Sequence, residues 1–385
     1  MELQLGVPLR VLLVSNLISP HQLPFAKSLV ALLGEEQFRF AATHPMDPEL
    51  GKRGWRNDEP YCWILRAGEN ALDLETYDRW WKEADVVLTG ERDLDRITDR
   101  VRQGRMTFYM SERWWKPPLG SMRLLYPGFA WMALRFSRLA RSPHFHFLAI
   151  GSHAAEDLRR IASLEGRAWS WGYFTQLPPA PACLERKGPL CVLWAGRMIA
   201  CKRLDTLIRA HARIKGLGAE AHLTLVGHGP CQGQMERLTQ HLGTASDVTF
   251  LPTMTGDQTR AQMRQAHVYV LASNAYEGWG AVLNEAMSEG CAVITSESAG
   301  AARSLIRHGE NGLLFRPGDH HQLAGLLESL NQNEPLRYRL AQEGQGTIQA
   351  YWNPAVAAER FLEVARAQLS GQVFPAYATG PMSPL

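Results

Sequence analysis

Paired cysteines, long apolar runs and a strong charge of either sign are all missing from this 385-residue sequence. The six cysteines are scattered, with no C-x-x-C pair and no nearby histidine pair, which argues against zinc and predicts a reducing, cytoplasmic compartment. No run of about 18 apolar residues occurs, and residues 1–10 lack the pattern of a signal peptide, so we expect at most a peripheral position on the inner face of the plasma membrane. A net charge of +3 is too small to predict nucleic-acid binding.

Acidic residues are missing from one long segment, since no Asp or Glu occurs between residues 113 and 155. Aromatic residues are interleaved there with basic ones, which are Arg113, Lys116, Arg123, Arg135, Arg138 and Arg141. Basic and aromatic side chains together suit an anionic membrane surface, which residues 113–145 would contact. The same mixture suits an acidic acceptor, or a helix that packs its rings into the core and leaves its arginines outside. The sequence leaves these alternatives open.

Apolar runs of strand length alternate with helical patterns, which predicts an α/β fold with parallel sheets. Three of the four residues 178–181 are proline, which continues neither a helix nor a central strand, so we place a domain linker there. We expect two Rossmann-like β/α/β domains that face one another across a cleft, with ligands bound beyond the carboxyl ends of the strands, and C-terminal helices. The predicted parts are a first domain (residues 1–174), a linker (175–186), a second domain (187–352), a helix that packs back on the first domain (353–370) and a loose tail (371–385).

The stretch from Glu277 to Met287 combines two carboxylates with a glycine-flanked turn. If the span from Glu277 to Glu285 were all helical, the two Cα atoms would lie about 12 Å apart. Two glycosidase carboxylates that bracket one bond lie only about 5–9.5 Å apart. The spacing therefore favours a grip on two ends of an elongated ligand. The turn also leaves backbone N–H groups at a helix N-terminus, where an anion such as a diphosphate binds well.

The segment Gly196–Asp205 follows a predicted strand and places cations at the start of a helix, where the helix dipole disfavours them. Arg197 can hold a phosphate with two hydrogen bonds and Lys202 can act as a point charge, so a bound anion would offset that cost. The alternative is a solvated basic loop. His21 also follows a predicted strand directly, where it could donate a hydrogen bond, move a proton in the cleft or cap the next helix.

The segment Gly227–Gly233 imitates a dinucleotide-binding fingerprint, with Asp247 following it. The imitation fails because a ribose-binding acid belongs after the next strand, whereas Asp247 precedes that strand. Pro230 also removes an N–H group that a phosphate would need, although proline suits the first helical position. We therefore interpret the segment, with Gly229, as a tight turn that lines a nucleotide site.

Taken together, these motifs resemble the retaining glycosyltransferases of family 4, which have the GT-B fold. The resemblance covers roughly residues 188–318, and the order of its motifs is highly specific. The motifs are Arg197 with Lys202, Gly227-His228-Gly229-Pro230, Glu277 through Glu285-Ala286-Met287, and Gly309-Glu310-Asn311-Gly312-Leu313-Leu314. The sequence departs from the family at Pro20-His21-Gln22, in the region of a Gly-Gly loop, and at Gly300-Ala301-Ala302-Arg303-Ser304, in place of Gly-Gly-x-Pro-Glu.

The resemblance implies a GT-B enzyme that moves a sugar, with retention, from a UDP- or GDP-sugar to a glycan or lipid-linked acceptor in polysaccharide or glycoconjugate biosynthesis. It implies that Arg197 and Lys202 neutralise the donor diphosphate, so that neither a metal nor another bound cofactor is needed. The implied donor contacts are Glu277 to sugar hydroxyls, Glu285 to ribose hydroxyls, Gly278, Gly280 and Ala281 to phosphate or sugar, and Gly229 at the nucleotide. We expect Glu277, Arg197, Lys202 and His21 to be catalytic. The alternatives are a non-catalytic protein that binds sugar nucleotides or glycans, and a sugar-nucleotide epimerase.

Overall fold

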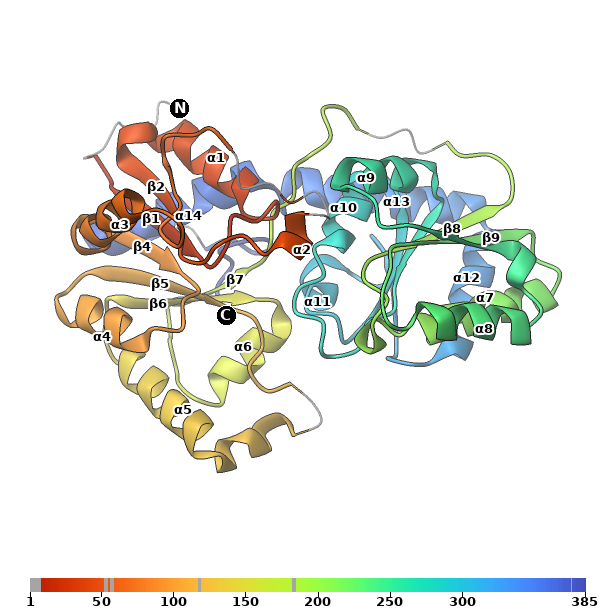
Figure 1. The fold of residues 1–385 in the computed structure, drawn as a ribbon, viewed down its shortest axis with the longest axis horizontal. Coiled ribbons are helices and arrows are strands. Elements are labelled where there is room, and N and C mark those ends of the chain that lie inside the picture. The colour runs from red at the N-terminus through yellow and green to blue at the C-terminus, as the bar shows by residue number, and fades with distance from the viewer. Residues whose placement is uncertain (1–7, 52–54, 56–58, 117–118, 182–184, 375) are drawn as a thin grey trace. The chain divides into compact units, whose positions relative to one another are not determined.

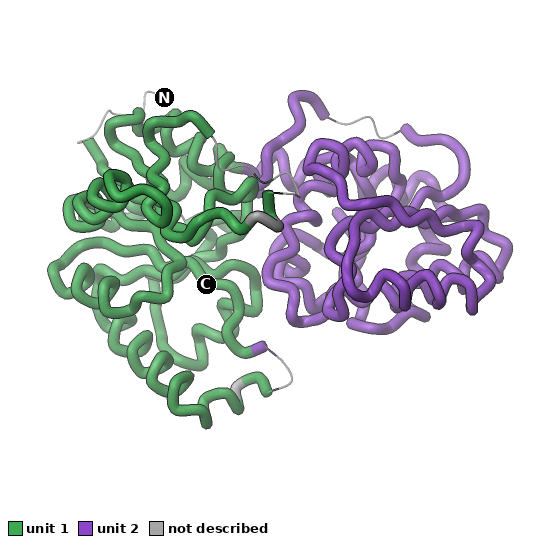
Figure 2. The backbone as a smooth tube through the Cα atoms, viewed as in Figure 1, with its two compact units in different colours: residues 1–115, 119–174, 354–385 green, residues 116–118, 175–353 purple. Residues whose placement is uncertain are grey.

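The structure is a computed structural model that describes residues 8–51, 55, 59–116, 119–181, 185–374 and 376–385. Residues 182–184 of the predicted linker and residues 117–118 of the basic aromatic segment lie outside the described residues. The chain forms two compact units (Figure 2). Residues 1–115, 119–174 and 354–385 make unit 1, and residues 116–118 and 175–353 make unit 2.

Unit 1 contains a seven-stranded parallel sheet in the order β3-β2-β1-β4-β5-β6-β7 (Figure 1). The strands are β1 (Val11–Ser15), β2 (Phe38–Ala42), β3 (Ile64–Leu65), β4 (Val86–Thr89), β5 (Met106–Ser111), β6 (Phe145–Ile150) and β7 (Ala168–Trp171). The central strands are buried along their whole length, which is why they occur in the sequence as continuous apolar runs. The direction of winding reverses between β1 and β4, and ligands of such sheets bind at the ends of these strands.

Two helices of unit 1, α3 (Ala71–Glu83) and α4 (Leu94–Arg102), begin where a side chain accepts hydrogen bonds from the first free N–H groups. Asn70 and Asp93 each accept hydrogen bonds from the backbone two and three residues later, which fixes the starts of α3 and α4. The helices are α1 (Leu23–Leu33), α2 (Pro48–Gly51), α3 (Ala71–Glu83), α4 (Leu94–Arg102), α5 (Pro127–Leu139), α6 (Ser152–Arg159) and α14 (Pro354–Ser370), with the 3-10 helices η1 (Glu35–Gln37) and η2 (Gly120–Leu125).

The last helix, α14, belongs to unit 1. Phe361 on α14 packs against Phe25, Phe108 and Trp171, with ring centroids 6.2, 5.1 and 6.2 Å away. These rings come from α1, β5 and β7, so one buried aromatic cluster joins α14 to the sheet and to the first helix.

The end of the chain contradicts the predicted loose tail. Met382 is fully buried, and its N–H group donates to the Ser170 oxygen at 2.9 Å, while the Ser170 N–H group donates to the Ser383 oxygen at 2.9 Å. Pro384 pairs antiparallel with Trp169. The prolines of the tail suggest irregular structure, but an edge strand such as β7 has unpaired backbone groups that the tail satisfies, and proline is tolerated at a sheet edge.

Unit 2 contains a six-stranded parallel sheet in the order β10-β9-β8-β11-β12-β13. The strands are β8 (Leu190–Ala195), β9 (Ala221–Val226), β10 (Val248–Leu251), β11 (Val268–Leu271), β12 (Ala292–Ser296) and β13 (Leu313–Phe315). The helices are α7 (Leu204–Gly216), α8 (Gln232–His241), α9 (Gly256–Gln265), α10 (Val282–Ser288), α11 (Ala302–Leu305), α12 (His320–Gln332) and α13 (Glu334–Ala350), with η3 (Ala200–Lys202) and η4 (Ala245–Asp247). The switch point lies between β8 and β11. The predicted α/β fold with two Rossmann-like domains is confirmed.

Candidate functional site

Three loops follow β8, β9 and β11 at the carboxyl edge of the unit 2 sheet. The first two dock backbone to backbone, because a Cβ atom on Gly227 would lie 2.0 Å from the Gly196 oxygen and one on Gly229 would lie 2.4 Å from the Met198 oxygen. The Met198 N–H group donates to the His228 oxygen at 3.0 Å. The Gly-x-Gly-Pro turn therefore fixes the position of the loop after β8.

Lys202 and Glu277, on the loops after β8 and β11, form an ion pair. Lys202 Nζ lies 2.5 Å from Glu277 Oε2, and Ser273 Oγ donates to the same oxygen at 2.7 Å. The two charged side chains are only 17% and 12% exposed. The loops are also joined through the backbone, because the Asn274 N–H group donates to the Cys201 oxygen at 2.8 Å. Among the described residues no hydrogen bond reaches the other carboxylate oxygen of Glu277, which is therefore available to a ligand.

Arg197 lies on the same loop as Lys202 but is exposed, and its side chain makes no ion pair or hydrogen bond within the described parts of the chain. Arg203, directly after Lys202, has a left-handed backbone with φ of 50° and pairs with Asp205 at 3.0 Å. A non-glycine residue in this conformation costs about 1–3 kcal/mol, and such strain is concentrated at functional positions. Lys202 and Arg203 are therefore both paired with carboxylates, whereas Arg197 is unpaired among the described residues.

The turn Gly278–Ala281 leads from Glu277 into α10. Gly280 has φ of 89°, and Gly300 allows a close approach of the next loop, because a Cβ atom there would lie 1.7 Å from the Gly278 oxygen. The Gly300 turn is therefore a packing device at this edge. Within the described residues the N–H groups of Gly280, Ala281 and Val282 donate no hydrogen bond, so an anion at this helix start can use them.

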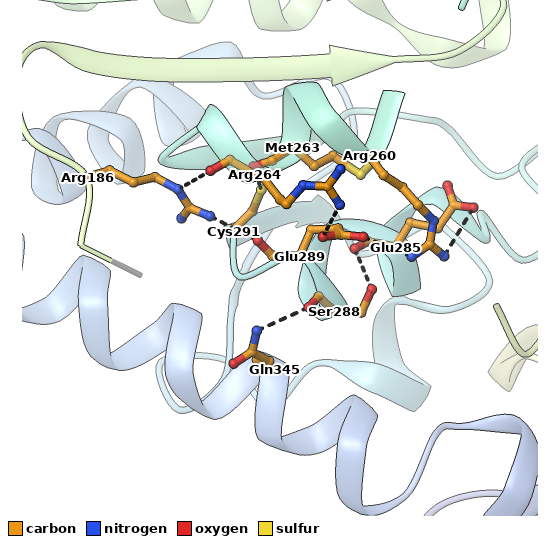
Figure 3. Close-up of polar contacts among 9 residues, drawn as sticks. All are labelled: Arg186, Arg260, Met263, Arg264, Glu285, Ser288, Glu289, Cys291 and Gln345. Carbon is orange, nitrogen blue, oxygen red and sulfur yellow. Dashed lines mark hydrogen bonds and ion pairs between the residues drawn. The ribbon is translucent and has the colours of Figure 1, made fainter. Parts of the chain in front are cut away.

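Glu285 on α10 faces a network of charges from α9 (Figure 3). Arg260 lies between two carboxylates, 3.8 Å from Glu285 and 3.0 Å from Glu289, and Arg264 lies 3.0 Å from the other oxygen of Glu289. Burial raises the pKa of Glu285, the Arg260 guanidinium opposes that shift, and Glu289 adds to it. Arg260 therefore positions Glu285 and favours its ionised form.

His21 belongs to unit 1, whereas the other predicted site residues belong to unit 2. Its ring centroid lies 5.9 Å from that of Trp55 and 6.2 Å from that of Tyr173. The next helix, α1, has Gln22 as its N-cap residue, and no side-chain hydrogen bond is made from that position. A small pocket at the carboxyl edge of the unit 1 sheet is lined by Leu13, His21, Gln22, Phe25, Met110, Trp171, Gly172, Tyr173 and Phe174.

Among the described residues, no group of three or more His, Cys, Asp or Glu side chains could hold a metal ion. None of the helices found there combines the length and the apolar character needed to cross a membrane. The described cysteines, which exclude Cys183, are all free thiols.

Comparison with known families gives a match for the part of the chain that forms the carboxyl edge of the unit 2 sheet. Residues 182–347 match the family described as "Glycosyl transferases group 1". This segment is a glycosyl transferases group 1 domain. The group 1 domain contains every predicted donor-side residue, from Arg197 to Glu285.

Curated relatives of the group 1 domain are glycosyltransferases by name. The lipopolysaccharide core biosynthesis glycosyltransferase LpsE of Rhizobium meliloti is 30% identical over 173 residues, which are 45% of this chain and 48% of that protein. The phosphatidyl-myo-inositol mannosyltransferase of Mycobacterium leprae is 30% identical over 169 residues, 44% of each chain. The chain therefore matches only about half the length of these relatives.

The fold resemblance extends beyond the group 1 domain. The crystal structure of Anabaena HepE in complex with UDP superimposes with a TM-score of 0.69, covering 93% of this chain and 100% of that one at 15% identity. This likeness shows the fold, which is the two-domain GT-B architecture.

The charged network around Glu285 is the part of the group 1 domain that sequence reasoning misses. Arg260 and Arg264 are four residues apart, as are Glu285 and Glu289, so each pair lies on one face of its helix. This spacing is a signal, but the sequence does not reveal that α9 packs on α10. Ser273 is missed for a similar reason, because only the turn after β11 brings its hydroxyl to Glu277.

Proposed function

We propose that the protein is a retaining glycosyltransferase that moves a sugar from a UDP- or GDP-sugar to a glycan or lipid-linked acceptor in polysaccharide or glycoconjugate biosynthesis. The observation that carries the proposal is the Lys202–Glu277 pair at the switch point of the group 1 domain. Two relatives are named for lipopolysaccharide core biosynthesis and for mannosyl transfer to phosphatidyl-myo-inositol, which supports a lipid-linked acceptor. The UDP bound to HepE supports a nucleotide-sugar donor.

In this proposal the donor diphosphate lies against Lys202, Arg197 and the N–H groups at the start of α10. Breaking the bond between the anomeric carbon and the diphosphate oxygen moves negative charge onto the leaving group. Fixed positive charges aimed at that position stabilise the transition state more than the bound donor, so they raise turnover as well as affinity. The two cations supply the charge, and the proposed mechanism needs no metal.

The carboxylates hold the two ends of the donor. Glu277 accepts hydrogen bonds from hydroxyls of the transferred sugar through its available oxygen, while Lys202 and Ser273 hold the other one. Glu285 accepts from the ribose hydroxyls. The acceptor oxygen bonds to the anomeric carbon on the face that the diphosphate leaves, and the acceptor proton passes to the departing phosphate oxygen. Retention then requires no protein base, and His21 serves the acceptor as a hydrogen-bond donor.

The test is the release of nucleoside diphosphate from UDP-, GDP- and ADP-sugars, with and without candidate acceptors. A retaining transferase gives acceptor-stimulated release and a product with the anomeric configuration of the donor. Nucleotide binding without release from any donor would favour the binding protein. Conversion of the sugar nucleotide without release of diphosphate would favour the epimerase.

A further inference from the structure

Large apolar side chains are exposed over η2 and α5 of unit 1. Six of the sixteen exposed large hydrophobic side chains among the described residues lie between residues 119 and 134. We call them the η2–α5 patch: Leu119, Met122, Leu125, Tyr126, Trp131 and Leu134. Leu125 is 80% exposed and Met122 59%. Six exposed large apolar side chains within residues 119–134 indicate an interaction surface, because large exposed apolar patches on a protein mark such sites.

Core packing explains only the opposite face of α5. Phe136 is buried and lies 4.8 Å from Trp114 and 4.9 Å from Tyr109, measured between ring centroids. Trp131 and Leu134 face away from that core, with exposed fractions of 57% and 48%. The aromatic segment predicted from the sequence therefore divides into a core face and an outer face, and the outer face has no covering element among the described residues.

Exposed arginines follow the apolar side chains on the outer face of α5. Trp131, Leu134 and Arg138 follow one another at spacings of three and four residues, so they lie on one side of the helix. Arg138 and Arg141 are exposed and form no ion pair within the described part of the chain. Arg135 is already occupied, because it pairs with Asp95 at 2.6 Å and lies 4.5 Å from the Trp131 ring centroid.

The neighbouring acids do not cancel this charge. On α4, Asp95 is neutralised by Arg135, and Asp99 lies 4.0 Å from Arg102. No acid occurs in the chain between residues 113 and 155. The patch is therefore an apolar surface bordered by unpaired arginines.

We propose that the η2–α5 patch docks on an anionic lipid bilayer. Tryptophan and tyrosine favour the level of the headgroups, the aliphatic side chains enter the acyl boundary, and Arg138 and Arg141 meet anionic headgroups. A second copy of this chain would bring the same arginines against each other, and like charges at an interface disfavour it. The proposal goes beyond the proposed function, because binding to lipid is measured without turnover and either idea can fail alone.

Co-sedimentation of the full chain with vesicles tests the proposal, using phosphatidylcholine alone and phosphatidylcholine mixed with phosphatidylglycerol. We expect binding to the anionic vesicles, weakened by salt. Arg138→Glu combined with Arg141→Glu should weaken that binding by roughly tenfold or more, since each basic residue contributes about 1 kcal/mol. Trp131→Ser combined with Leu134→Ser should also weaken it.

Matched controls come from exposed residues elsewhere in unit 1. Leu72→Ser with Leu74→Ser removes two exposed leucines of α3, and Arg102→Glu reverses an exposed charge of α4. These controls should bind vesicles like the unmodified protein, and all variants should keep its thermal midpoint. Absence of binding to anionic vesicles, or equal losses in controls and patch variants, would overturn the proposal. Self-association that Trp131→Ser with Leu134→Ser abolishes would also overturn it, in favour of a second copy.

Discussion

The carboxyl edges of the two sheets are built differently. At the unit 2 edge, glycines let neighbouring loops lock backbone to backbone, and Lys202 pairs with Glu277. At the unit 1 edge, rings line a small pocket, with His21 beside Tyr173 and Trp55. One edge is thus fixed by its backbone and the other is shaped by its side chains. Under the proposed function, the fixed edge suits a donor whose diphosphate is always the same, and the ring-lined edge suits an acceptor that differs between enzymes.

The largest expected effect is a loss of turnover when the charged residues at the carboxyl edge of the unit 2 sheet are changed. Glu277→Gln keeps the shape of the side chain and removes its charge, so turnover should fall by roughly 100-fold or more. Affinity for the nucleoside diphosphate should change little, because in the proposed function the carboxylate contacts the sugar. Arg197→Ala should lower both quantities, since in the proposed function its guanidinium binds the diphosphate before and during transfer. Initial rates at saturating donor and calorimetric titration with UDP or GDP separate the two effects.

Lys202→Met has a matched control in the same unit. Lys215→Met breaks another ion pair, to Asp247 at 3.0 Å, where α7 ends and β10 is about to begin. Only Lys202→Met should abolish turnover. Full activity of Lys202→Met would contradict the proposed contact between Lys202 and the donor diphosphate. Equal losses of turnover in the two variants would point to an effect on stability and not on chemistry.

Glycine substitutions test whether the backbone locks the unit 2 edge. Gly300→Ala would place Cβ 1.7 Å from the Gly278 oxygen, a backbone atom that cannot rotate away. We expect the free energy of unfolding to fall by about 1–3 kcal/mol and nucleotide binding to weaken. Gly325→Ala in α12 meets nothing within 4 Å, so it should raise the free energy of unfolding by roughly 0.5–1 kcal/mol. Chemical denaturation measures both, and a free energy of unfolding that Gly300→Ala leaves unchanged would show that this close backbone contact does not stabilise the edge.

The same contrast explains what sequence can predict. The apolar run Leu190–Ala195 predicts β8 because a central parallel strand is buried on both faces, and β8 has these bounds. The edge strand β7 escapes prediction, since its four residues carry too little pattern and its partner Pro384 lies far along the chain. Lys202 and Glu277 are singled out by their motifs, but 75 residues separate them, and only the strand order brings their loops together.

A smaller effect is expected from the rings inside unit 1. His146 is fully buried between Phe108 and Trp169, with ring centroids 4.6 and 5.5 Å away, and neither of its ring nitrogens has a hydrogen-bond partner among the described residues. Burial lowers the pKa of His146 from 6.5 to about 3. The unfolded chain therefore binds this proton more readily, and stability falls as pH drops below 6.5 by about 1.4 kcal/mol per pH unit.

His146→Phe should remove that acid sensitivity. The phenyl ring keeps the stacking and has no unpaired N–H group, so unfolding free energy at neutral pH should rise by about 1 kcal/mol. Denaturation at a series of pH values measures both changes. An unchanged dependence on pH would show that the ring packing of unit 1 does not carry this penalty.

The smallest expected effect is a change in the pH dependence of nucleotide affinity, at Glu285 of unit 2. In the proposed function Glu285 accepts hydrogen bonds from the ribose hydroxyls, and a carboxylate accepts more strongly than a protonated carboxyl group, so nucleotide affinity should fall as pH drops through the pKa of Glu285. Arg260 opposes the shift that burial imposes on that pKa, and removing its charge should therefore move the loss of affinity to higher pH. Arg260→Met is compared with Arg264→Met, because Arg264 pairs with Glu289 and, unlike Arg260, forms no ion pair with Glu285. Calorimetry with UDP or GDP across pH should show the shift for Arg260→Met alone, with recovery in Arg260→Lys. Identical profiles in the two methionine variants would mean that Arg260 only supports the packing of α9 on α10, and that backbone contacts govern the ribose end of the donor site as well.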